Sequence, residues 1–227
     1  MASEHIYKQF DSDLEAIRAK VLEMGTLVEE QTANAVKSLL NTDIKLAEQV
    51  MKRDDQINDL EVAIDEETSL LIAKRSPAAG DLRNIMMMLK IITDLERMGD
   101  EAAKIARSTT RIFEDNRMSK PRFTEIKGMA KAVQGMIKTA LNSFARLDLS
   151  DTIDILEKDK QVDDEIKKVE HEIEVLKKGA PEKINKIAIE TSSELVKKLI
   201  GADVNNSSIS AIVDDLSKRN GDKYYGN

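Results

Sequence analysis

The 227-residue sequence contains no cysteine, no tryptophan and only three prolines. The absence of cysteine excludes a disulfide framework and a thiolate zinc site, and it fits a reducing compartment. Aromatic residues make up only 3% of the chain, whereas alanine, leucine, isoleucine, lysine, glutamate and aspartate dominate. This composition predicts an all-α protein built from long amphipathic helices.

Basic residues are outnumbered by acidic ones, which gives a net charge of -7 at pH 7. Binding to nucleic acid requires a basic face, and no segment supplies one, so we expect no nucleic-acid partner. Long hydrophobic runs are also missing, because Lys90 interrupts the most apolar stretch, 85–92, and the N-terminus has no signal-peptide core. We therefore expect a cytoplasmic protein without direct membrane insertion.

Prolines and capping residues divide the chain into helices. Thr42-Asp43 predicts a turn and an N-cap, and Ser76-Pro77 predicts an N-cap followed by proline at the first helical position. Gly179-Ala180-Pro181 predicts a helix end. The expected helices cover about 4–40, 44–74, 77–114, 122–145, 151–179 and 181–200, with a short helix over 208–218. The short connections predict that the first three helices form an antiparallel bundle.

The chain also repeats itself at a shift of 105 positions, the separation of Met24 from Met129. The first two predicted helices recur as the fourth and fifth. The same shift should return Glu96 and Asp100 at positions 201 and 205, which hold Gly201 and Asn205 instead. The repeat therefore fails in its third helix. Among the residues that it superposes are Ser38 on Ser143, Asp43 on Asp148 and Asp54 on Asp159.

The segment 94–100 places two of its carboxylates, Glu96 and Asp100, four residues apart on the helix that we expect to be most buried. Glu96 lies almost in line with Ile85 and Leu89, so the acid pair interrupts an apolar stripe. Burial of unpaired carboxylates is costly and requires a compensating cation.

The preceding helix supplies further oxygen ligands. If its polar face turns toward Glu96 and Asp100, four or more oxygens converge, which suits a divalent or trivalent ion such as magnesium, manganese or iron. Tetrahedral zinc is less suited, because the chain has only His5 and His171 and no cysteine. The polar face follows helical spacing and comprises Asp54, Asn58, Glu61 and Asp65.

Two other interpretations of these carboxylates remain open. They could form ordinary salt bridges with Arg97, Lys90 or Lys74 on a solvated face, as charged residues on helices often do. They could also belong to a carboxylate-bundle metalloprotein, although no Glu-x-x-His pair supports a di-iron enzyme. The sequence offers no glycine-rich phosphate loop and no nucleophile with its base, so we expect no enzymatic activity.

Residues from about 9 to 165 resemble the PhoU family of phosphate-transport accessory proteins. The resemblance implies two antiparallel three-helix bundles, over 1–116 and 117–220, and a polar tail over 221–227. The matching segments are 54–65, Lys74-Arg75-x-Pro77-x-x-Asp81-Leu82-Arg83 and Leu95-Glu96-Arg97-Met98-Gly99-Asp100.

The same resemblance implies a homodimer that binds metal at its acidic motifs without catalytic turnover. It also implies negative regulation of the phosphate-starvation response, between the phosphate ABC transporter and its sensor histidine kinase. By position in the motifs, the expected metal ligands are Glu96, Asp100, Asp54, Asn58, Glu61 and Asp65.

The chain departs from the family pattern after residue 165, where no second Glu-Arg-x-Gly-Asp follows, so the second bundle has an atypical third helix. Segments from about residue 173 onward are similar to the C-terminal end of a b-type peripheral-stalk subunit of F-type ATP synthase. Two alternatives to a PhoU-like regulator are therefore a helical structural or stalk subunit, and a chimeric chain with a C-terminus like that of the ATP synthase b subunit. The segments similar to the stalk subunit are 176–187, Leu199-Ile200-Gly201 and 209–215.

Overall fold

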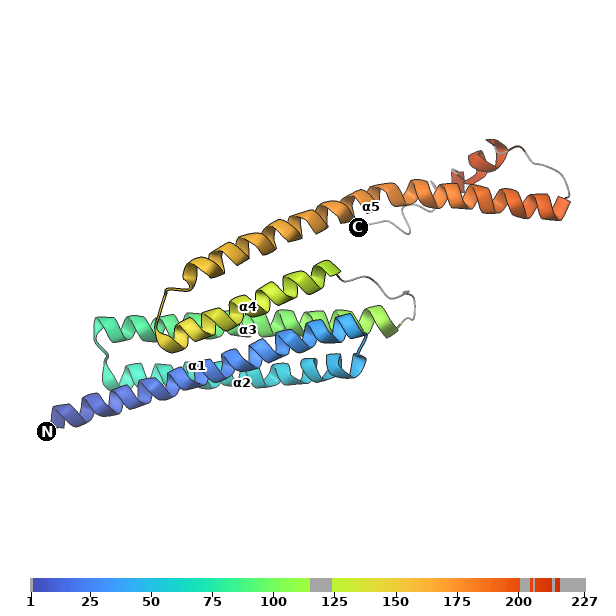
Figure 1. Ribbon diagram of the computed structural model, residues 1–227. Coiled ribbons are helices and arrows are strands. Elements are labelled where there is room, and N and C mark those ends of the chain that lie inside the picture. Colours follow the sequence, from blue (N-terminus) through green and yellow to red (C-terminus); the bar gives the residue numbers. More distant parts are fainter. Residues whose placement is uncertain (1, 115–123, 201–204, 206, 214, 217–227) are drawn as a thin grey trace. The chain divides into compact units, whose positions relative to one another are not determined.

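The computed structural model describes residues 2–114, 124–200, 205, 207–213 and 215–216. Within these residues the chain is helical and contains no strand, which confirms the all-α class. Five long helices follow one another along the chain (Figure 1). They are α1 (Ala2–Asn41), α2 (Ile44–Arg75), α3 (Ala79–Glu114), α4 (Thr124–Arg146) and α5 (Thr152–Ile200).

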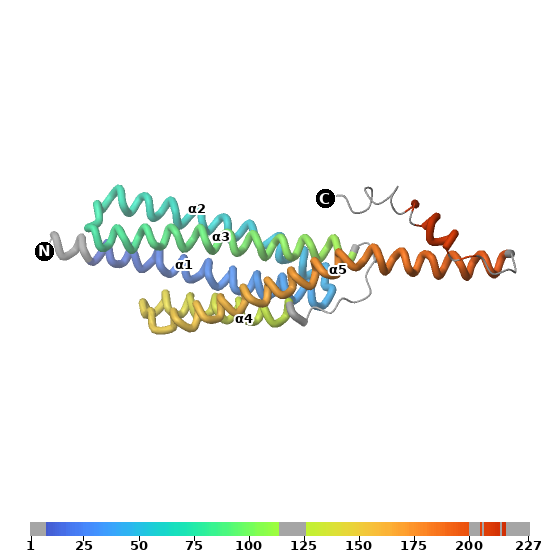
Figure 2. Tube along the Cα trace, turned by 90° about the horizontal axis from the view of Figure 1, so that it is seen from above, coloured from blue at the N-terminus to red at the C-terminus, as the bar shows by residue number. Residues whose placement is uncertain are grey.

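The helices α1, α2 and α3 form the predicted antiparallel bundle, and each packs against the other two (Figures 1 and 2). Apolar residues at helical spacing line the inside of this bundle. A second, smaller cluster of mostly alanines joins the same helices nearer their α1–α2 turn. The largest buried side chains of the main core include Met24, Ile57, Ile64, Ile85 and Ile92.

The turns that end α1 and α4 have the same geometry, which bears out the internal repeat. Thr42 and Leu147, 105 positions apart, both have positive φ, at 59° and 54°. The next residue in each turn donates its amide to a serine carbonyl five residues earlier, Asp43 to Ser38 at 2.9 Å and Asp148 to Ser143 at 3.0 Å. The repeat is therefore a repeat of backbone structure as well as of residue identities.

The turn between α2 and α3 differs from the expectation at Ser76. Ser76 is not the N-cap of the third helix, because it has φ 45° and donates its amide to the Ile72 carbonyl, which terminates α2. A left-handed residue followed by Pro77 ends a helix. The helix α3 begins at Ala79 instead. In contrast, Asp43 caps α2 as predicted, since its side chain accepts the Leu46 amide at 3.0 Å.

The expected helix end at 179–181 is also wrong, because α5 continues through Pro181 to Ile200. Proline removes one backbone hydrogen bond, to the carbonyl of Lys177, and disfavours a helix interior. Lys177 is exposed, so water can satisfy that carbonyl. Pro181 therefore costs α5 one hydrogen bond, but it does not end the helix, because the helix is exposed to water there. Residues 207–213 form the start of the expected short helix, while 217 and 218 lie outside the described residues.

The helix α4 packs against α1 of the bundle. Arg18 of α1 donates to the carbonyls of Phe144 and Ala145, at 2.8 and 2.7 Å, in the last turn of α4. Its guanidinium also lies over the Phe144 ring, 5.6 Å from the centroid. A cation on the last carbonyls of a helix satisfies acceptors that have no partner within the helix.

Two compact units divide the chain, residues 1–165 and 166–227. The expected boundary between bundles, at 116/117, lies outside the described residues and stays a prediction. No described helix is long and apolar enough to cross a membrane.

Candidate metal centre

Four of the acidic residues predicted from the sequence interact electrostatically between α2 and α3. Glu96 and Asp100 on α3 and Asp54 and Glu61 on α2 are all partly buried. Glu96 stands at the edge of the core stripe, next to the buried Leu95, rather than inside it. The structure therefore brings four of the six predicted ligands to one seam between two helices.

Burial and repulsion between carboxylates both act on Glu96 in this seam. Burial raises the pKa of Glu96, and the charges of Asp100, Glu61 and Asp54 raise it further, in that order. Arg97 is the cation nearby, but it lies 4.0 Å from Asp94 in an exposed pair and only weakly lowers the Glu96 pKa. The effect of Arg97 on the pKa of Glu96 is thus smaller than the combined effect of burial and the neighbouring carboxylates.

The pKa of Asp54, on α2, is also raised. Burial raises the pKa of Asp54, a hydrogen bond from Gln31 opposes this, and the charge of Asp100 raises the pKa again. Arg107 lowers it to a smaller extent. Two carboxyls on different helices therefore both favour a proton or another cation, which is the property expected of a cation-binding cluster.

A buried glutamine that the sequence reading missed holds this seam together. Gln31 of α1 is 2% exposed, and its Nε2 donates to Asp54 Oδ1 at 2.8 Å and to the Gly99 carbonyl at 3.3 Å. It thereby connects α1, α2 and α3 at a single point. A signal was available, since Gln31 interrupts an apolar stripe of α1 that includes Met24, Val28 and Ala35.

Gly99, inside the Glu96–Asp100 motif, allows α3 to approach α2 closely. A Cβ at this position would lie 3.0 Å from Ile57 Cδ1 and 3.5 Å from Asp54 Oδ1. The glycine therefore sets the distance between the two acidic faces. This gives the motif a geometric role in addition to its charge.

The remaining predicted ligands lie farther out. Asn58 and Asp65 on α2 are exposed. In the part of the chain that the structure describes, no three carboxylate or imidazole side chains are gathered closely enough to hold one metal ion. His171 is on the exposed surface of α5, and the side chain of His5 lies outside the described residues.

The donor chemistry of the seam nevertheless fits a hard cation. Its candidate ligands are carboxylate oxygens, which magnesium, manganese and ferric iron prefer. A bound ion would relieve the repulsion that raises the pKa of Glu96 and Asp54. The residues that would hold it are Asp54 and Glu61 from α2 and Glu96 and Asp100 from α3.

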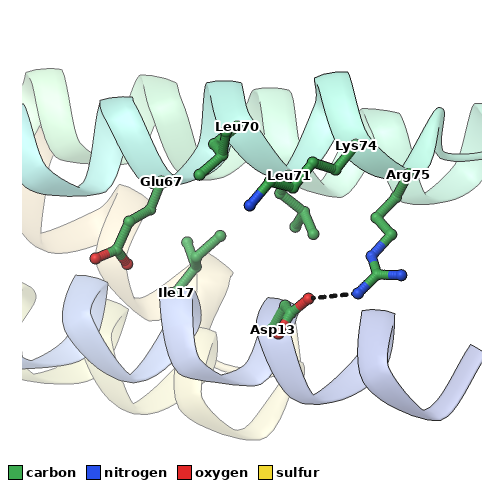
Figure 3. Close-up of a pocket in the computed structure, with 7 residues that line it drawn as sticks. All are labelled: Asp13, Ile17, Glu67, Leu70, Leu71, Lys74 and Arg75. Carbon is green, nitrogen blue, oxygen red and sulfur yellow. Dashed lines mark hydrogen bonds and ion pairs between the residues drawn. The ribbon is translucent and has the colours of Figure 1, made fainter. Parts of the chain in front are cut away.

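A pocket of about 220 Å³ between α1 and α2 is a separate feature (Figure 3). Arg75 reaches across it to Asp13, with Nη2 3.4 Å from Oδ2, and Lys20 pairs with Glu67 at its rim. Its charges are thus largely matched within the protein. The lining comprises Asp13, Ile17, Glu67, Leu70, Leu71, Lys74 and Arg75.

Known proteins are similar to this chain in both sequence and fold. A family model described as the PhoU domain matches residues 21–109 and 126–201, which extends beyond the motif resemblance ending near 165. A phosphate-specific transport system accessory protein PhoU homolog from Pseudomonas aeruginosa is 40% identical over 186 residues, covering 82% of this chain and 76% of that protein. The PhoU accessory protein of Escherichia coli (strain K12) is 39% identical over 163 residues, covering 72% and 67%.

Solved structures give the same result. The crystal structure of PhoU from Pseudomonas aeruginosa matches with a TM-score of 0.69 and 36% identity, covering 90% of this chain and 92% of that one. The PhoU regulatory protein of the phosphate transport system from Streptococcus pneumoniae matches with a TM-score of 0.67 and 30% identity, covering 74% and 79%.

Proposed function

The chain belongs to the PhoU family, and from this premise we propose that it is an accessory regulator of phosphate uptake. It acts as a negative regulator of the phosphate-starvation response, between a phosphate ABC transporter and its sensor histidine kinase, in the cytoplasm. The observation that supports this most is a family match that covers both halves of the chain at about 40% identity to named accessory proteins. Its function is binding rather than catalytic turnover.

The acidic seam is the proposed metal centre of this regulator. A bound cation would supply positive charge that the carboxylates of α2 and α3 lack. Asp54, Glu61, Glu96 and Asp100 are the candidate ligands, and their side chains would have to move together to share an ion. Gln31 holds Asp54 by a hydrogen bond, and Gly99 lets the two helices approach closely. Carboxylates held by a shared cation would fix α2 against α3, and the first bundle would then present a more rigid surface to partners.

Metal binding is tested with purified full-length protein. Elemental analysis after dialysis against magnesium, manganese or ferric iron is expected to find bound ion in the wild type. Glu96→Gln with Asp100→Asn keeps the side-chain shapes and should lose that ion. Asp94→Ala with Glu101→Ala, which removes two exposed carboxylates of the same helix, serves as the matched control and should retain it. Equal metal content in wild type and Glu96/Asp100 variant would reject the metal assignment.

Regulation is tested in a bacterium that lacks its own PhoU and carries a phosphatase reporter. Expression of the chain should lower reporter output in phosphate-rich medium. Fully derepressed output, with the protein present and folded, would reject the proposal that this chain regulates by itself. Because the metal measurement is made on purified protein, the two parts of the proposal fail independently.

A further inference from the structure

The α1–α2 pocket lies farther along α2 than the acidic seam. Its α2 residues fall within 67–75, whereas the seam takes its α2 carboxylates from Asp54 and Glu61. Its other wall is α1 rather than α3, and all of its lining belongs to the unit 1–165 (Figure 3). The pocket is therefore a separate candidate site, built within the first bundle.

The two carboxylates of the pocket already have partners. Asp13 accepts through Oδ2 from Arg75 Nη2 at 3.4 Å and through Oδ1 from Gln9 Nε2 at 2.8 Å. Glu67 pairs with Lys20 at the rim. Because cations balance the charge of both carboxylates, their repulsion of an anionic ligand is reduced.

The cationic side chains, in contrast, keep donors that have no acceptor. The Nε of Arg75 is buried and lacks a hydrogen-bond partner among the described residues. A buried guanidinium N–H without an acceptor costs free energy, which a ligand oxygen would recover. Lys74 lines the pocket (Figure 3) and forms no ion pair within the described part of the chain. The pocket thus has free donors of two kinds, an ammonium and a guanidinium N–H.

Three apolar side chains form the floor of the pocket. Ile17 and Leu71 are buried, at 3% and 5% exposure, whereas Leu70 is 51% exposed. Covering the exposed part of Leu70 would be favourable in proportion to the apolar area removed from water. A ligand that fits this floor therefore has an apolar group beside its charged group.

The balance of charge favours a monoanion. Lys20, Lys74 and Arg75 carry three positive charges against the two negative charges of Asp13 and Glu67, which leaves an excess of one positive charge. A carboxylate matches this excess. A phosphate dianion would instead leave one negative charge without compensation beside two carboxylates.

We propose that the α1–α2 pocket binds a small monocarboxylate that carries a short apolar group. The carboxylate accepts from Lys74 Nζ and Arg75 Nε, and the apolar group lies on the floor. Asp13 keeps its contact with Arg75 Nη2 and so holds the guanidinium in place. The same chemistry occurs on a free short-chain acid and at the C-terminus of a peptide that ends in an aliphatic residue.

The two donors come from a sequence segment that the acidic seam does not use. Lys74 and Arg75 are the last two residues of α2, and the left-handed Ser76 ends the helix directly after them. The internal repeat of 105 positions places Gly179 and Ala180 at the equivalent positions. The second half of the chain therefore does not supply the same pair of donors, and we expect one such site per chain.

Binding is tested by nuclear magnetic resonance on methyl-labelled full-length protein, with hexanoate as the free acid and N-acetyl-leucine as the mimic of a peptide C-terminus. Titration should shift the methyl signals of Ile17, Leu70 and Leu71, with a dissociation constant of about 1 mM or lower for at least one probe. The tighter probe identifies the source of the carboxylate. Unshifted signals at these methyl groups up to about 20 mM of both probes would overturn the proposal.

Further probes separate the charge from the apolar contact. Hexanol and N-acetyl-leucine amide keep the apolar group without the carboxylate, and each should bind at least about 10-fold more weakly than its acid. Acetate keeps the carboxylate without the longer tail and should also bind about 10-fold more weakly than hexanoate. Equal binding of the uncharged probes and their acids, or tighter binding of inorganic phosphate at the same methyl groups, would overturn the proposal.

Variants assign the two donors. Lys74→Met keeps the length of the side chain and loses its charge, whereas Arg75→Lys keeps the charge and loses the Nε donor. Each should raise the dissociation constant by about 5-fold or more. Lys45→Met, at an exposed lysine in the first turn of α2, is the matched control and should bind as wild type does. Wild-type affinity in both Lys74→Met and Arg75→Lys would overturn the proposal.

Asp13→Asn gives a result that loss of structure cannot imitate. Asparagine keeps an oxygen that can accept from Arg75 and removes a negative charge beside the pocket, so binding should tighten by about 3-fold or more. A partly exposed ion pair contributes little to folding, and thermal unfolding verifies that the variant is folded. Weaker binding by folded Asp13→Asn protein would contradict the charge balance and overturn the proposal.

Discussion

Gln31 links all three helices of the first bundle by hydrogen bonds. Its side-chain amide is buried, and it satisfies an oxygen on α2 and a carbonyl on α3 at once. A buried amide with two partners fixes the relative positions of the helices more strictly than an apolar side chain of similar size.

Replacement of Gln31 tests this structural role. We expect Gln31→Ala to lower the free energy of unfolding by about 2 to 4 kcal/mol, from lost hydrogen bonds and a cavity. Urea unfolding of the metal-free protein measures the change. Gln49→Ala, at an exposed position on α2, should stay within about 0.5 kcal/mol of wild type. Equal effects at the two positions would contradict the role of Gln31.

The raised pKa of Glu96 predicts how this residue makes stability depend on pH in the metal-free protein. Its pKa in the folded state is raised above the ordinary value of 4.5, first by burial and then by Asp100, Glu61 and Asp54. The folded state therefore binds a proton at Glu96 more readily than the unfolded state does. The contribution of Glu96 to stability is full below its unfolded pKa and is lost as pH rises through its raised folded pKa.

Glu96→Gln removes that titration. The variant should lose less stability than wild type when pH rises from about 4 to 7, measured by thermal or urea unfolding in the presence of a chelator. Glu101→Gln, at an exposed position of α3, should keep the wild-type pH dependence. A pH profile of Glu96→Gln that matches wild type would show that Glu96 is not the group under repulsion.

At the scale of helices, the contact of α4 with α1 depends on one glycine. A Cβ at Gly25 would lie 2.3 Å from Leu141 Cδ2, which is too close for any real contact. We expect Gly25→Ala to push α4 away and raise amide exchange over 126–146, despite the better helix propensity of alanine.

The double variant Gly25→Ala with Leu141→Ala separates steric from other effects. Removing the leucine methyl groups should relieve the clash, so the two substitutions should be less harmful together than the sum of their single costs. Gly128→Ala, whose Cβ meets nothing within 4 Å, should stabilise the helix by about 0.5 to 1 kcal/mol. Additive costs for Gly25→Ala and Leu141→Ala would contradict this contact.

The sequence predicted helix positions well where a local signal has a local cause. Asp43 caps α2 because its side chain reaches an amide three residues ahead, and that spacing is visible in the sequence. The predictions at Ser76 and Pro181 were wrong, because the structure around each residue overrides its usual local preference. Ser76 adopts a left-handed conformation, and Pro181 lies in a solvated helix that can lose a hydrogen bond.

The candidate site was partly predictable for a related reason. Helical spacing places Asp54 and Glu61 on one face, and tertiary packing of α2 on α3 then decides which acids meet. Asn58 and Asp65 share the spacing but point outward, which no pattern within a single helix can determine. Gln31 comes from a third helix, so it enters the site only through the fold.

At the scale of the whole molecule, the buried core is concentrated in the first three helices. Most of the fully buried large side chains belong to α1, α2 and α3, whereas α5 exposes Leu156, Leu176 and Leu199. Unfolding free energy follows burial of apolar area, so the unit 1–165 should resist opening more than the unit 166–227.

Native-state hydrogen exchange tests this distribution. We expect amides of 44–112 to be strongly protected at every protein concentration, because their core lies within one chain. Amides of 181–199 should exchange faster, since the side chains there are exposed or only partly buried. Equal protection of α3 and 181–199 in the monomer would instead mean that the second unit is as well packed as the first.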